Sequence, residues 1–350
     1  MKINLMTPIN QLGYGVAGLN ILKALQKQAE VSLFPIGQPQ VTNQTDADAV
    51  RKGIHTSQTF DHKAPCVKIW HQNQMAERVG SGKFFGFPIF ELDKFNSLEK
   101  HHLDSCDALM VCSNWAWDVA NKQTNHFPNF IHVVPLGVDM DIFKPATPRN
   151  DNKTIFFNCG KWEIRKGHDI LINAFEKVLG HGQDAELWMM CNNPFNSPEE
   201  EGKWKQLYQH PKVKIIPRAE TQQEVYNIMA QVDCGVFPSR AEGWNLELLE
   251  MMACGKHVVT TDYSAHTEFC TKDNAGLVTI KETEPAYDGK WFFRQGNWAK
   301  IDAHVQMDLH MKMMRFILDK KGTLNEAGIE TAKKFSWDNT ASKILGITNV

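Results

Sequence analysis

Two glutamates stand eight positions apart in the stretch PSRAEGWNLELLEMMACGKHVV, residues 238–259: Glu242 in an expected loop and Glu250 in the helix that follows it. If all eight steps were helical, a rise of 1.5 Å per residue would separate the backbones by roughly 12 Å, and the carboxylates would not share a face. Acid and base groups acting on one glycosidic bond lie roughly 5 to 9.5 Å apart. The spacing therefore favours contacts with two different parts of one ligand.

A second group of chemically capable residues is the cation pair Arg165 and Lys166 in FFNCGKWEIRKGHDILINAF, which follows an expected strand and Gly160. Open α/β sheets bind ligands at the carboxyl ends of their strands. An arginine grips phosphate oxygens through two N–H groups at once, and a lysine acts as a point charge. The pair predicts a phosphate site, and a solvated basic loop is the alternative.

The helix that carries Glu250 has a predicted start at Asn245, a residue type that caps helix N-termini. The free N–H groups of NLEL would then face the ligand and help to hold an anion. Helix-surface glutamates without a binding role are the ordinary alternative for this segment.

Glycines in G-x-G-x-x-G spacing, Gly13, Gly15 and Gly18, stand where a first strand gives way to a first helix. Glycine lets a ligand approach the backbone, and a helix N-terminus attracts phosphate. However, TPINQL separates the strand from the glycines, and the second strand, VSLFPIGQPQ, has no acid for ribose hydroxyls. A nicotinamide or flavin site is therefore disfavoured, and a turn used only for packing stays open.

The elements that must position these residues are βα units, because short apolar runs alternate with helical patterns along the whole chain. The predicted strands are 3–6, 31–35, 67–70, 108–112 and 131–135 in the first half, and 154–158, 186–190, 213–217, 234–238, 257–260 and 276–279 in the second. Both halves are expected to form doubly wound parallel sheets. The polar, proline-containing segment 137–154 is typical of a linker, and we place the boundary near Pro148.

Composition agrees with two domains. The chain has 350 residues, of which 42% are hydrophobic, and a formal net charge of -2, so it has no global attraction to nucleic acid or acidic lipid. Its eight cysteines are scattered without C-x-x-C spacing, which predicts reduced, buried thiols in a cytosolic protein. No run approaches the roughly 20 apolar residues that span a bilayer, so a soluble protein is expected.

The stretch GVFPSRAEGWNLELLEMMACGKHVV resembles the signature segment of the retaining glycosyltransferases of family 4. Further similar segments are VVPLGVDMDIFKP, CGKWEIRKGHDILINAF and FSWDNTASKI. The resemblance implies the GT-B fold, two Rossmann-like domains that face a cleft. Residues 1–147 would form the acceptor-side domain, residues 148–334 the nucleotide-sugar-binding domain, and residues 335–350 a terminal helix that packs back toward the first domain.

The resemblance also implies roles within the second domain. Arg165 and Lys166 would hold the donor diphosphate, Glu250 the ribose hydroxyls, and Glu242 the hydroxyls of the donor sugar near the reacting carbon. Backbone amides at Asn245 and Leu246 would help to hold phosphate. The usual EGFGL of the family is EGWNL here, which puts sugar preference and the approach of backbone to phosphate in doubt.

In the first domain, the resemblance implies that Gly13 and Gly15 lie against the phosphate. It also implies that His71, at the end of the strand CVKIWH, lies beside the donor sugar. A core or capping histidine is the alternative for His71. No metal is expected. The motif DMD, Asp139 to Asp141, falls in the linker, and Arg165, Lys166 and two helix N-termini would neutralise the diphosphate.

Two segments are not explained by this scheme. The Met-rich helix expected over residues 307–321 suits core packing better than a membrane or partner surface. The aromatic-rich segment 284–302 would line the sugar pocket or cover its outer edge.

The predicted function is metal-independent transfer of a sugar, with retention, from a UDP- or GDP-sugar donor to a hydroxyl acceptor, without a resident cofactor. The acceptor would be a glycan, a lipid-linked molecule or a small molecule, and a nucleic-acid acceptor stays open. A nucleotide-sugar isomerase or hydrolase and a non-catalytic nucleotide-sugar-binding protein are the rival functions. The expected location is the cytoplasm, with a peripheral membrane position left open.

Overall fold

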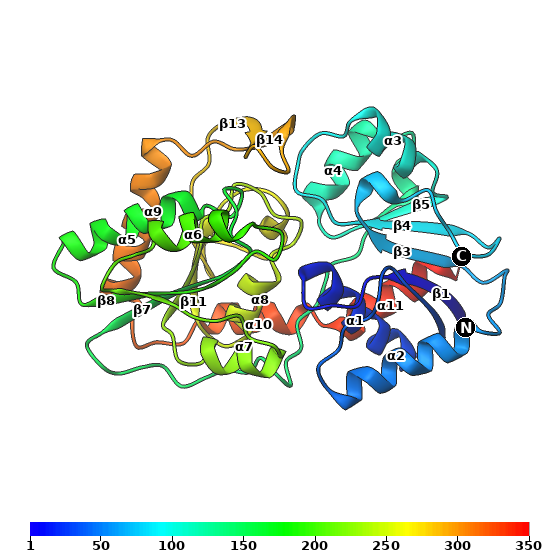
Figure 1. Ribbon diagram of the computed structural model, residues 1–350, viewed down its shortest axis with the longest axis horizontal. Coiled ribbons are helices and arrows are strands. Elements are labelled where there is room, and N and C mark those ends of the chain that lie inside the picture. The colour runs from blue at the N-terminus through cyan, green and yellow to red at the C-terminus, as the bar shows by residue number, and fades with distance from the viewer. Residues whose placement is uncertain (350) are drawn as a thin grey trace. The chain divides into compact units, whose positions relative to one another are not determined.

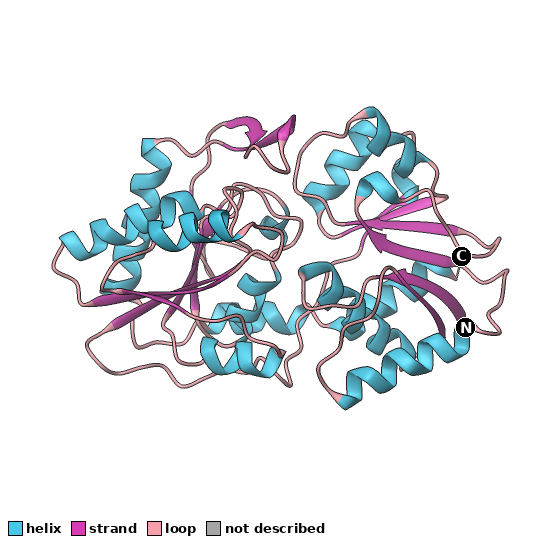
Figure 2. Ribbon diagram, viewed as in Figure 1, coloured by secondary structure: helices cyan, strands magenta, loops and turns pink. Residues whose placement is uncertain are grey.

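The computed structural model describes residues 1–349 and divides the chain into two compact units. The first unit contains Met1–Gly137 together with the described residues after Lys334, and the second contains Val138–Lys334. Each unit is built around one six-stranded parallel sheet with helices packed against it (Figure 1, Figure 2).

The sheet of the first unit has the strand order β2-β1-β3-β4-β5-β6, and all its neighbours are parallel. Its strands are β1 (Lys2–Thr7), β2 (Glu30–Pro35), β3 (Cys66–Trp70), β4 (Phe84–Pro88), β5 (Ala108–Val111) and β6 (Ile131–Val133). Its helices are α1 (Gly13–Gln26), α2 (Gln44–Ser57), α3 (Ser97–Asp104), α4 (Asn114–Gln123) and α11 (Trp337–Thr348), with short 3-10 turns η1 (Gln72–Gln74) and η2 (Pro128–Phe130). The strand order reverses between β1 and β3.

The second sheet has the order β12-β11-β10-β7-β8-β9, again parallel throughout. Its strands are β7 (Thr154–Gly160), β8 (Ala185–Cys191), β9 (Val213–Ile215), β10 (Cys234–Phe237), β11 (His257–Thr261) and β12 (Gly276–Val278). Around it lie α5 (His168–Gly180), α6 (Pro198–Leu207), α7 (Gln222–Met229), α8 (Leu246–Ala253), α9 (Ala303–Asp319), α10 (Glu326–Lys334) and the 3-10 turn η3 (Ala265–Glu268). The order reverses between β7 and β10, which is where such folds bind ligands.

The predicted fold class, two doubly wound parallel sheets, is confirmed, but two features were missed. Strand β4 escaped the sequence analysis because Gly86 and Pro88 interrupt its apolar run. The antiparallel hairpin of β13 (Thr283–Tyr287) and β14 (Phe293–Ala299) falls, except for Thr283, within the aromatic-rich segment 284–302, for which no strand was predicted. Strands that carry prolines and glycines give weak sequence signals.

The division of the chain falls after Gly137, ten residues before the boundary expected near Pro148. The division falls earlier because residues before Pro148 contact the second unit. The Ala146 N–H donates to the carbonyl oxygen of Cys254 at 3.0 Å, and Phe143 is fully buried. The polar composition of the segment suggested a linker, although its backbone is tied to the second unit.

Helix α11 packs on the first unit, where the Thr340 hydroxyl donates to the Pro135 carbonyl at 2.7 Å. Ser336 caps this helix, since its hydroxyl accepts the Asn339 N–H. Gly137 lies so close to α11 that a Cβ there would come within 2.3 Å of the Trp337 nitrogen.

All eight cysteines are buried and none forms a disulfide, as the sequence analysis predicted.

One face of the Met-rich helix α9 packs into the core through Leu309, Met313 and Phe316, while Met307 and Met311 on the same helix are exposed. Core packing therefore explains only part of that helix. Within residues 1–349, no helix combines the length and the apolarity that crossing a bilayer requires.

Candidate functional site

The predicted donor-site residues of the second unit gather at the carboxyl ends of β7 and β10, where the strand order reverses. Strand β7 leads into the loop 161–167 and helix α5, and β10 leads into the loop 238–245 and helix α8. Arg165 and Lys166 lie in the first loop, and Glu242 lies in the second. Residues separated by about 80 positions in the chain are thereby brought together.

Backbone contacts lock the two loops to each other. Gly167 has φ +73°, and a Cβ there would come within 2.1 Å of the Pro238 carbonyl oxygen, so only glycine fits. The Arg240 N–H donates to the Arg165 carbonyl at 2.6 Å. The Arg240 guanidinium also pairs with both carboxylate oxygens of Asp169 on α5, at 2.7 and 2.8 Å. The loops therefore form one rigid platform.

Glu242 is buried between the two predicted cations. One carboxylate oxygen accepts from Arg165 at 2.8 Å, and the other accepts from Lys166 at 3.1 Å and from the Ser239 hydroxyl at 2.7 Å. Burial alone would raise the pKa of Glu242, but Lys166 and Arg165 outweigh it and hold that pKa well below its ordinary value. Glu242 is ionised at neutral pH.

The network extends through two further acids. Arg165 donates from Nε and one terminal nitrogen to Glu163, at 3.1 and 2.7 Å, and Lys161 approaches the other oxygen of Glu163 at 2.8 Å. Lys166 also reaches Glu247 on α8 at 3.4 Å. Burial would lower the pKa of Lys166, but Glu242 and Glu247 raise it overall, so it stays charged.

Sequence analysis considered Arg165 and Lys166 as phosphate-binding cations, and the structure shows that both already form ion pairs with acids. Arg165 is 4% exposed, and it also donates to the Ala241 carbonyl at 2.7 Å, so four of its donor bonds go to protein oxygens. Lys166 has two acidic partners among the described residues and three donor hydrogens. Lys166 is thus better placed to receive an anion, whereas Arg165 organises the acids around it.

His168 is the first residue of α5 and contacts the loop 161–167 that precedes it. Its Nδ1 accepts the Glu163 N–H at 3.1 Å, and its Nε2 lies 2.9 Å from the Asn158 side-chain oxygen, which fixes the proton on Nε2. Burial, followed by the nearby charge of Lys166, lowers the pKa of His168 to about 3. It is a neutral positioning group. Sequence analysis assigned it no role.

Glu250 has a different environment from Glu242. It is buried on α8, and its carboxyl group has no hydrogen-bonding or ion-pair partner in the described part of the chain. Burial, with a smaller contribution from Glu247, raises its pKa to about 8. A buried carboxyl group without a partner has its hydrogen-bonding capacity available for a ligand.

Asn245 occupies the predicted N-cap position of α8 but does not cap the helix with its side chain. Its backbone is left-handed, with φ 79°, instead of the extended conformation that lets a cap side chain reach back. Both polar atoms of its carboxamide are buried without a partner. The capping role predicted for the Asn245 side chain is therefore wrong. The next residue, Leu246, begins α8.

The predicted residues of the first unit lie at the strand reversal of their own sheet. Gly13 is exposed, and a Cβ added there would have no other atom within 4 Å. Gly15 is buried, and a Cβ added there would come within 2.3 Å of Asn10. Gly15 therefore has a packing role whatever else it does. His71 follows β3 and is exposed, and its ring centroid lies 4.5 Å from that of Tyr14, which stands between the two glycines.

Asp139 of the DMD motif holds its own turn, because its carboxylate accepts the N–H of Asp141 at 3.0 Å. Over residues 1–349, no group of three or more acidic, histidine or cysteine side chains is arranged to hold a metal ion.

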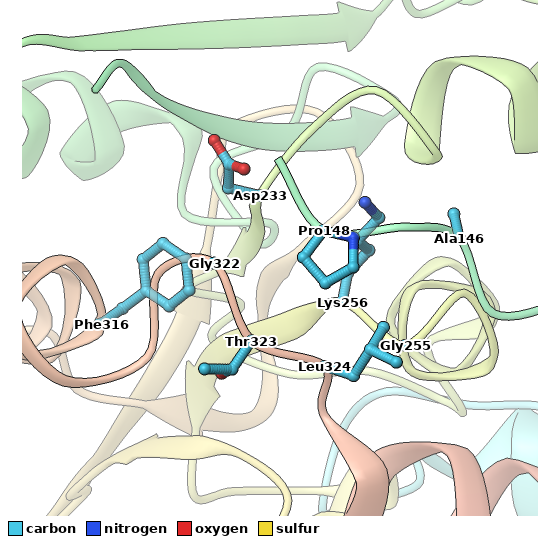
Figure 3. Close-up of a pocket in the computed structure, with 9 residues that line it drawn as sticks. All are labelled: Ala146, Pro148, Asp233, Gly255, Lys256, Phe316, Gly322, Thr323 and Leu324. Carbon is cyan, nitrogen blue, oxygen red and sulfur yellow. The ribbon is translucent and has the colours of Figure 1, made fainter. Parts of the chain in front are cut away.

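A small pocket opens at the opposite edge of the second sheet (Figure 3). It is lined by Asp233 and Lys256, which directly precede β10 and β11, and by parts of the segments 146–148 and 322–324. Lys256 is held there by the Ala230 carbonyl at 2.9 Å. This pocket lies at the amino ends of the strands and is separate from the network around Glu242.

Comparison with known proteins adds three findings. Residues 153–287 match the family model described as Glycosyl transferases group 1. A D-inositol 3-phosphate glycosyltransferase of Jonesia denitrificans is 23% identical over 240 residues, which cover 63% of this chain and 51% of that protein. A GDP-mannose-dependent alpha-(1-6)-phosphatidylinositol dimannoside mannosyltransferase of Mycobacterium tuberculosis is 28% identical over 152 residues, which cover 40% of this chain and 38% of that protein.

Among solved structures, Anabaena HepE in complex with UDP and glucose superposes with a TM-score of 0.72 at 15% identity. The superposition covers 100% of this chain and 99% of HepE. By contrast, the chain spans about half or less of the length of the two curated relatives it matches. The structural match therefore concerns the fold of the whole chain, and the sequence matches concern part of each relative.

Proposed function

We propose that this chain, which has the GT-B fold and carries a glycosyl transferases group 1 domain within residues 153–287, moves a sugar from a nucleotide diphosphate to a hydroxyl acceptor. The observation that carries the proposal is the position of Glu242. It is ionised, buried between Arg165 and Lys166, and placed at the strand reversal of the second sheet.

In this proposal, Lys166 stabilises the departing diphosphate, and Arg165 holds Glu242 and Glu163 in place for the reaction. The carboxylate of Glu242 accepts hydrogen bonds from hydroxyls of the donor sugar. The bond between the anomeric carbon and the diphosphate breaks, the acceptor oxygen bonds to that carbon on the same face, and the acceptor proton passes to the departing diphosphate. Preorganised charge and positioning supply most of such a rate enhancement.

We further propose that Glu250 binds the ribose hydroxyls and that the amides of Asn245 and Leu246 help to hold phosphate. The lack of a protein partner for Glu250 supports the first role. The roles that family resemblance implies for Gly13, Gly15 and His71 stay predictions. A UDP- or GDP-sugar is the proposed donor, since HepE was solved with UDP and one relative is named as GDP-mannose-dependent.

Retention and independence from metal belong to the same proposal. The buried cations Arg165 and Lys166 support it, because charge that a divalent ion would otherwise supply is already built into the loop. No resident cofactor enters the scheme. A cytoplasmic location is proposed from the eight unbridged cysteines.

The proposal is tested first by donor binding. UDP, GDP and their sugars are titrated calorimetrically into the wild type and into Lys166→Gln, with Lys212→Gln as a charge-matched control from the exposed pair with Asp184. Loss of one charge-assisted bond predicts roughly 10- to 100-fold weaker binding for Lys166→Gln and no change for the control. If no nucleoside diphosphate or its sugar binds the wild type, the proposal is wrong.

Product analysis then separates the rival functions. Release of nucleotide that requires an added acceptor supports transfer, and release without an acceptor indicates a hydrolase. Tight donor binding without turnover on a broad acceptor panel indicates a binding protein. An α-linked product from an α-linked donor shows retention, and activity that persists in EDTA shows independence from divalent metal.

A further inference from the structure

Four aromatic side chains of the second unit stand exposed and form two contacting pairs, Phe195 with Trp291 and Tyr287 with Phe293. Tyr287, Trp291 and Phe293 belong to the β13–β14 hairpin and its turn, and Phe195 belongs to the loop after β8. Between 47% and 61% of each residue is exposed, although each ring contacts another member of the set. We call Phe195, Tyr287, Trp291 and Phe293 the aromatic row. The hairpin that bears most of it is labelled β13 and β14 in Figure 1.

The base of the hairpin is fixed to the loop that carries Glu242. The Ala299 N–H donates to the Arg240 carbonyl at 2.9 Å, and the Arg240 guanidinium lies 5.6 Å from the ring centroid of buried Trp298. Arg240 is two residues before Glu242. The hairpin therefore starts directly at the candidate site.

The tip of the hairpin is held as well. One carboxylate oxygen of Asp288 accepts the N–H groups of Lys290, Trp291 and Phe292, which closes the turn. The Lys290 ammonium donates to the Phe195 carbonyl at 2.8 Å and to Glu200 at 2.9 Å. The rings are thus presented in a fixed arrangement, which reduces the entropy lost when a ligand binds.

Phe195 connects the aromatic row to the ion-pair network. The ammonium of Lys161 lies 5.6 Å from the Phe195 ring centroid and 2.8 Å from Glu163, which in turn binds Arg165. A ligand that lies along the row would therefore end beside the proposed site of transfer.

Three of the cations around the row are paired with acids, whereas Arg294, whose guanidinium lies 5.4 Å from the Tyr287 ring centroid, has no acidic partner among the described residues. Lys161 pairs with Glu163, Lys290 with Glu200, and Lys300 with Glu282. Single-stranded nucleic acid and anionic lipid both need cations that are available to phosphate. Arg294 alone is not the group of cations that either of these partners requires, so the exposed rings better suit a neutral molecule with an apolar face and a polar edge. A hexose ring has both, since its C–H face stacks on an aromatic ring and its hydroxyls point outward.

We propose that the aromatic row binds the saccharide chain of a neutral glycan acceptor and directs its end toward Glu242. This inference rests on the proposed glycosyl transfer and adds the acceptor class to it. It also places acceptor contacts on the second unit, whereas the sequence analysis expected them on the first.

The test uses the full chain and the double variant Trp291→Ala with Phe293→Ser. Phe127→Ala, which removes an aromatic residue that is 72% exposed in the first unit, is the matched control. Each protein is applied to an array of neutral oligosaccharides of at least four hexoses, and the hits are measured in solution by saturation-transfer NMR and calorimetry. Titration with UDP and GDP on the same proteins reports the donor site separately.

The expected result is binding of a neutral oligosaccharide by the wild type and by Phe127→Ala, and binding about tenfold weaker or absent in the double variant, with nucleotide affinity unchanged. The inference is overturned if no oligosaccharide binds, or if the double variant binds as tightly as the wild type. The inference is also overturned if the wild type binds phosphatidylglycerol vesicles or single-stranded oligonucleotides and the double variant loses that binding while it still binds saccharide as the wild type does. Failure of UDP and GDP to bind the wild type contradicts the proposed function instead.

Discussion

Glu242 and Glu250 are both buried, yet their protonation states at neutral pH are opposite. Burial acts to raise the pKa of each. Only Glu242 has cations within contact distance, and these reverse the effect. One acid is thus a fixed negative charge that can accept sugar hydroxyls, and the other is a carboxyl group that can also donate a hydrogen bond below pH 8.

The raised pKa of Glu250 predicts a stability penalty that grows with pH. In the unfolded chain the carboxyl group has a pKa of about 4.3, so below that pH both states are protonated and no stability is lost. As pH rises toward 8, the unfolded state releases the proton and the folded state keeps it, so stability falls. A glutamine cannot lose a proton, so Glu250→Gln should be more stable than the wild type at pH 8.5, by up to roughly 3 to 5 kcal/mol. At pH 4.5 this stability advantage should be absent.

Urea denaturation at the two pH values measures this difference. Glu176→Gln is the control, because Glu176 is exposed on α5. Parallel pH dependence of wild type and Glu250→Gln would show that Glu250 titrates normally.

Asn245 combines backbone strain with an unpaired buried carboxamide, so its replacement by glycine should stabilise the protein. A left-handed conformation costs a residue with a Cβ roughly 1 kcal/mol, and a buried amide without partners adds a similar amount. Asn245→Gly is expected to gain about 1 to 2 kcal/mol in urea denaturation, and Asn245→Ala, which keeps the strain, less. A less stable glycine variant would mean that the carboxamide makes a favourable contact.

Sequence analysis singled out Arg165, Lys166 and Glu242, which the structure brings together, but not their further partners. Arg165, Lys166, Glu242 and Glu250 were singled out by residue type, by position after expected strands and by family resemblance. Glu163, Ser239 and His168 were missed, because a loop of unknown conformation gives no rule for which side chains point inward. The ion pairs of Lys166 were not predicted either, since the acids that pair with it are about 80 positions away.

At the level of elements, the site depends on how tightly the loops after β7 and β10 approach each other. Gly167 should tolerate no side chain, because φ is +73° and a Cβ would strike the Pro238 carbonyl. Gly167→Ala is expected to cost at least about 2 kcal/mol of stability and to weaken nucleotide binding.

Gly180, at the last position of α5, is the matched control. Nothing lies within 4 Å of a Cβ there, and its φ is not positive. Gly180→Ala should therefore raise stability slightly, by a few tenths of a kcal/mol up to about 1. Equal effects of the two substitutions, measured by thermal and urea unfolding, would contradict the role assigned to the loop contact.

Periodicity predicted the strands that are continuous apolar runs and missed those that are not. In β4, Gly86 looks like a strand breaker, but a Cβ at this position would come within 2.7 Å of the Cys106 sulfur, so close packing requires glycine there. In the hairpin, Pro285 falls within β13, which is mostly exposed, and Gly296 falls within β14, which is exposed only at its start. Such strands are held by tertiary contacts, which local pattern does not report.

At the scale of the whole molecule, each unit has its own buried core and its own strand reversal. The core of the second unit includes Phe156, Phe175 and Phe316, and that of the first includes Phe84, Phe90 and Leu109. Alternating βα pattern was enough to predict two such sheets. It could not locate the division between them, because the contact that ties residue 146 to the second unit involves Cys254, more than 100 positions away.

The position of the division predicts a difference between two fragments. Residues 138–334 contain the whole second core and keep the bond from Ala146 to Cys254, so this fragment should unfold cooperatively and, if the proposed function holds, bind UDP or GDP. Residues 148–334 lack that bond and expose the backbone around Gly255 and Lys256, where Ala146 lines the small pocket. Loss of one backbone hydrogen bond and of some apolar cover should lower stability by roughly 1 to 3 kcal/mol, measured by urea denaturation. A fragment 148–334 as stable as 138–334 would return the boundary to Pro148 and make the preceding ten residues a true linker.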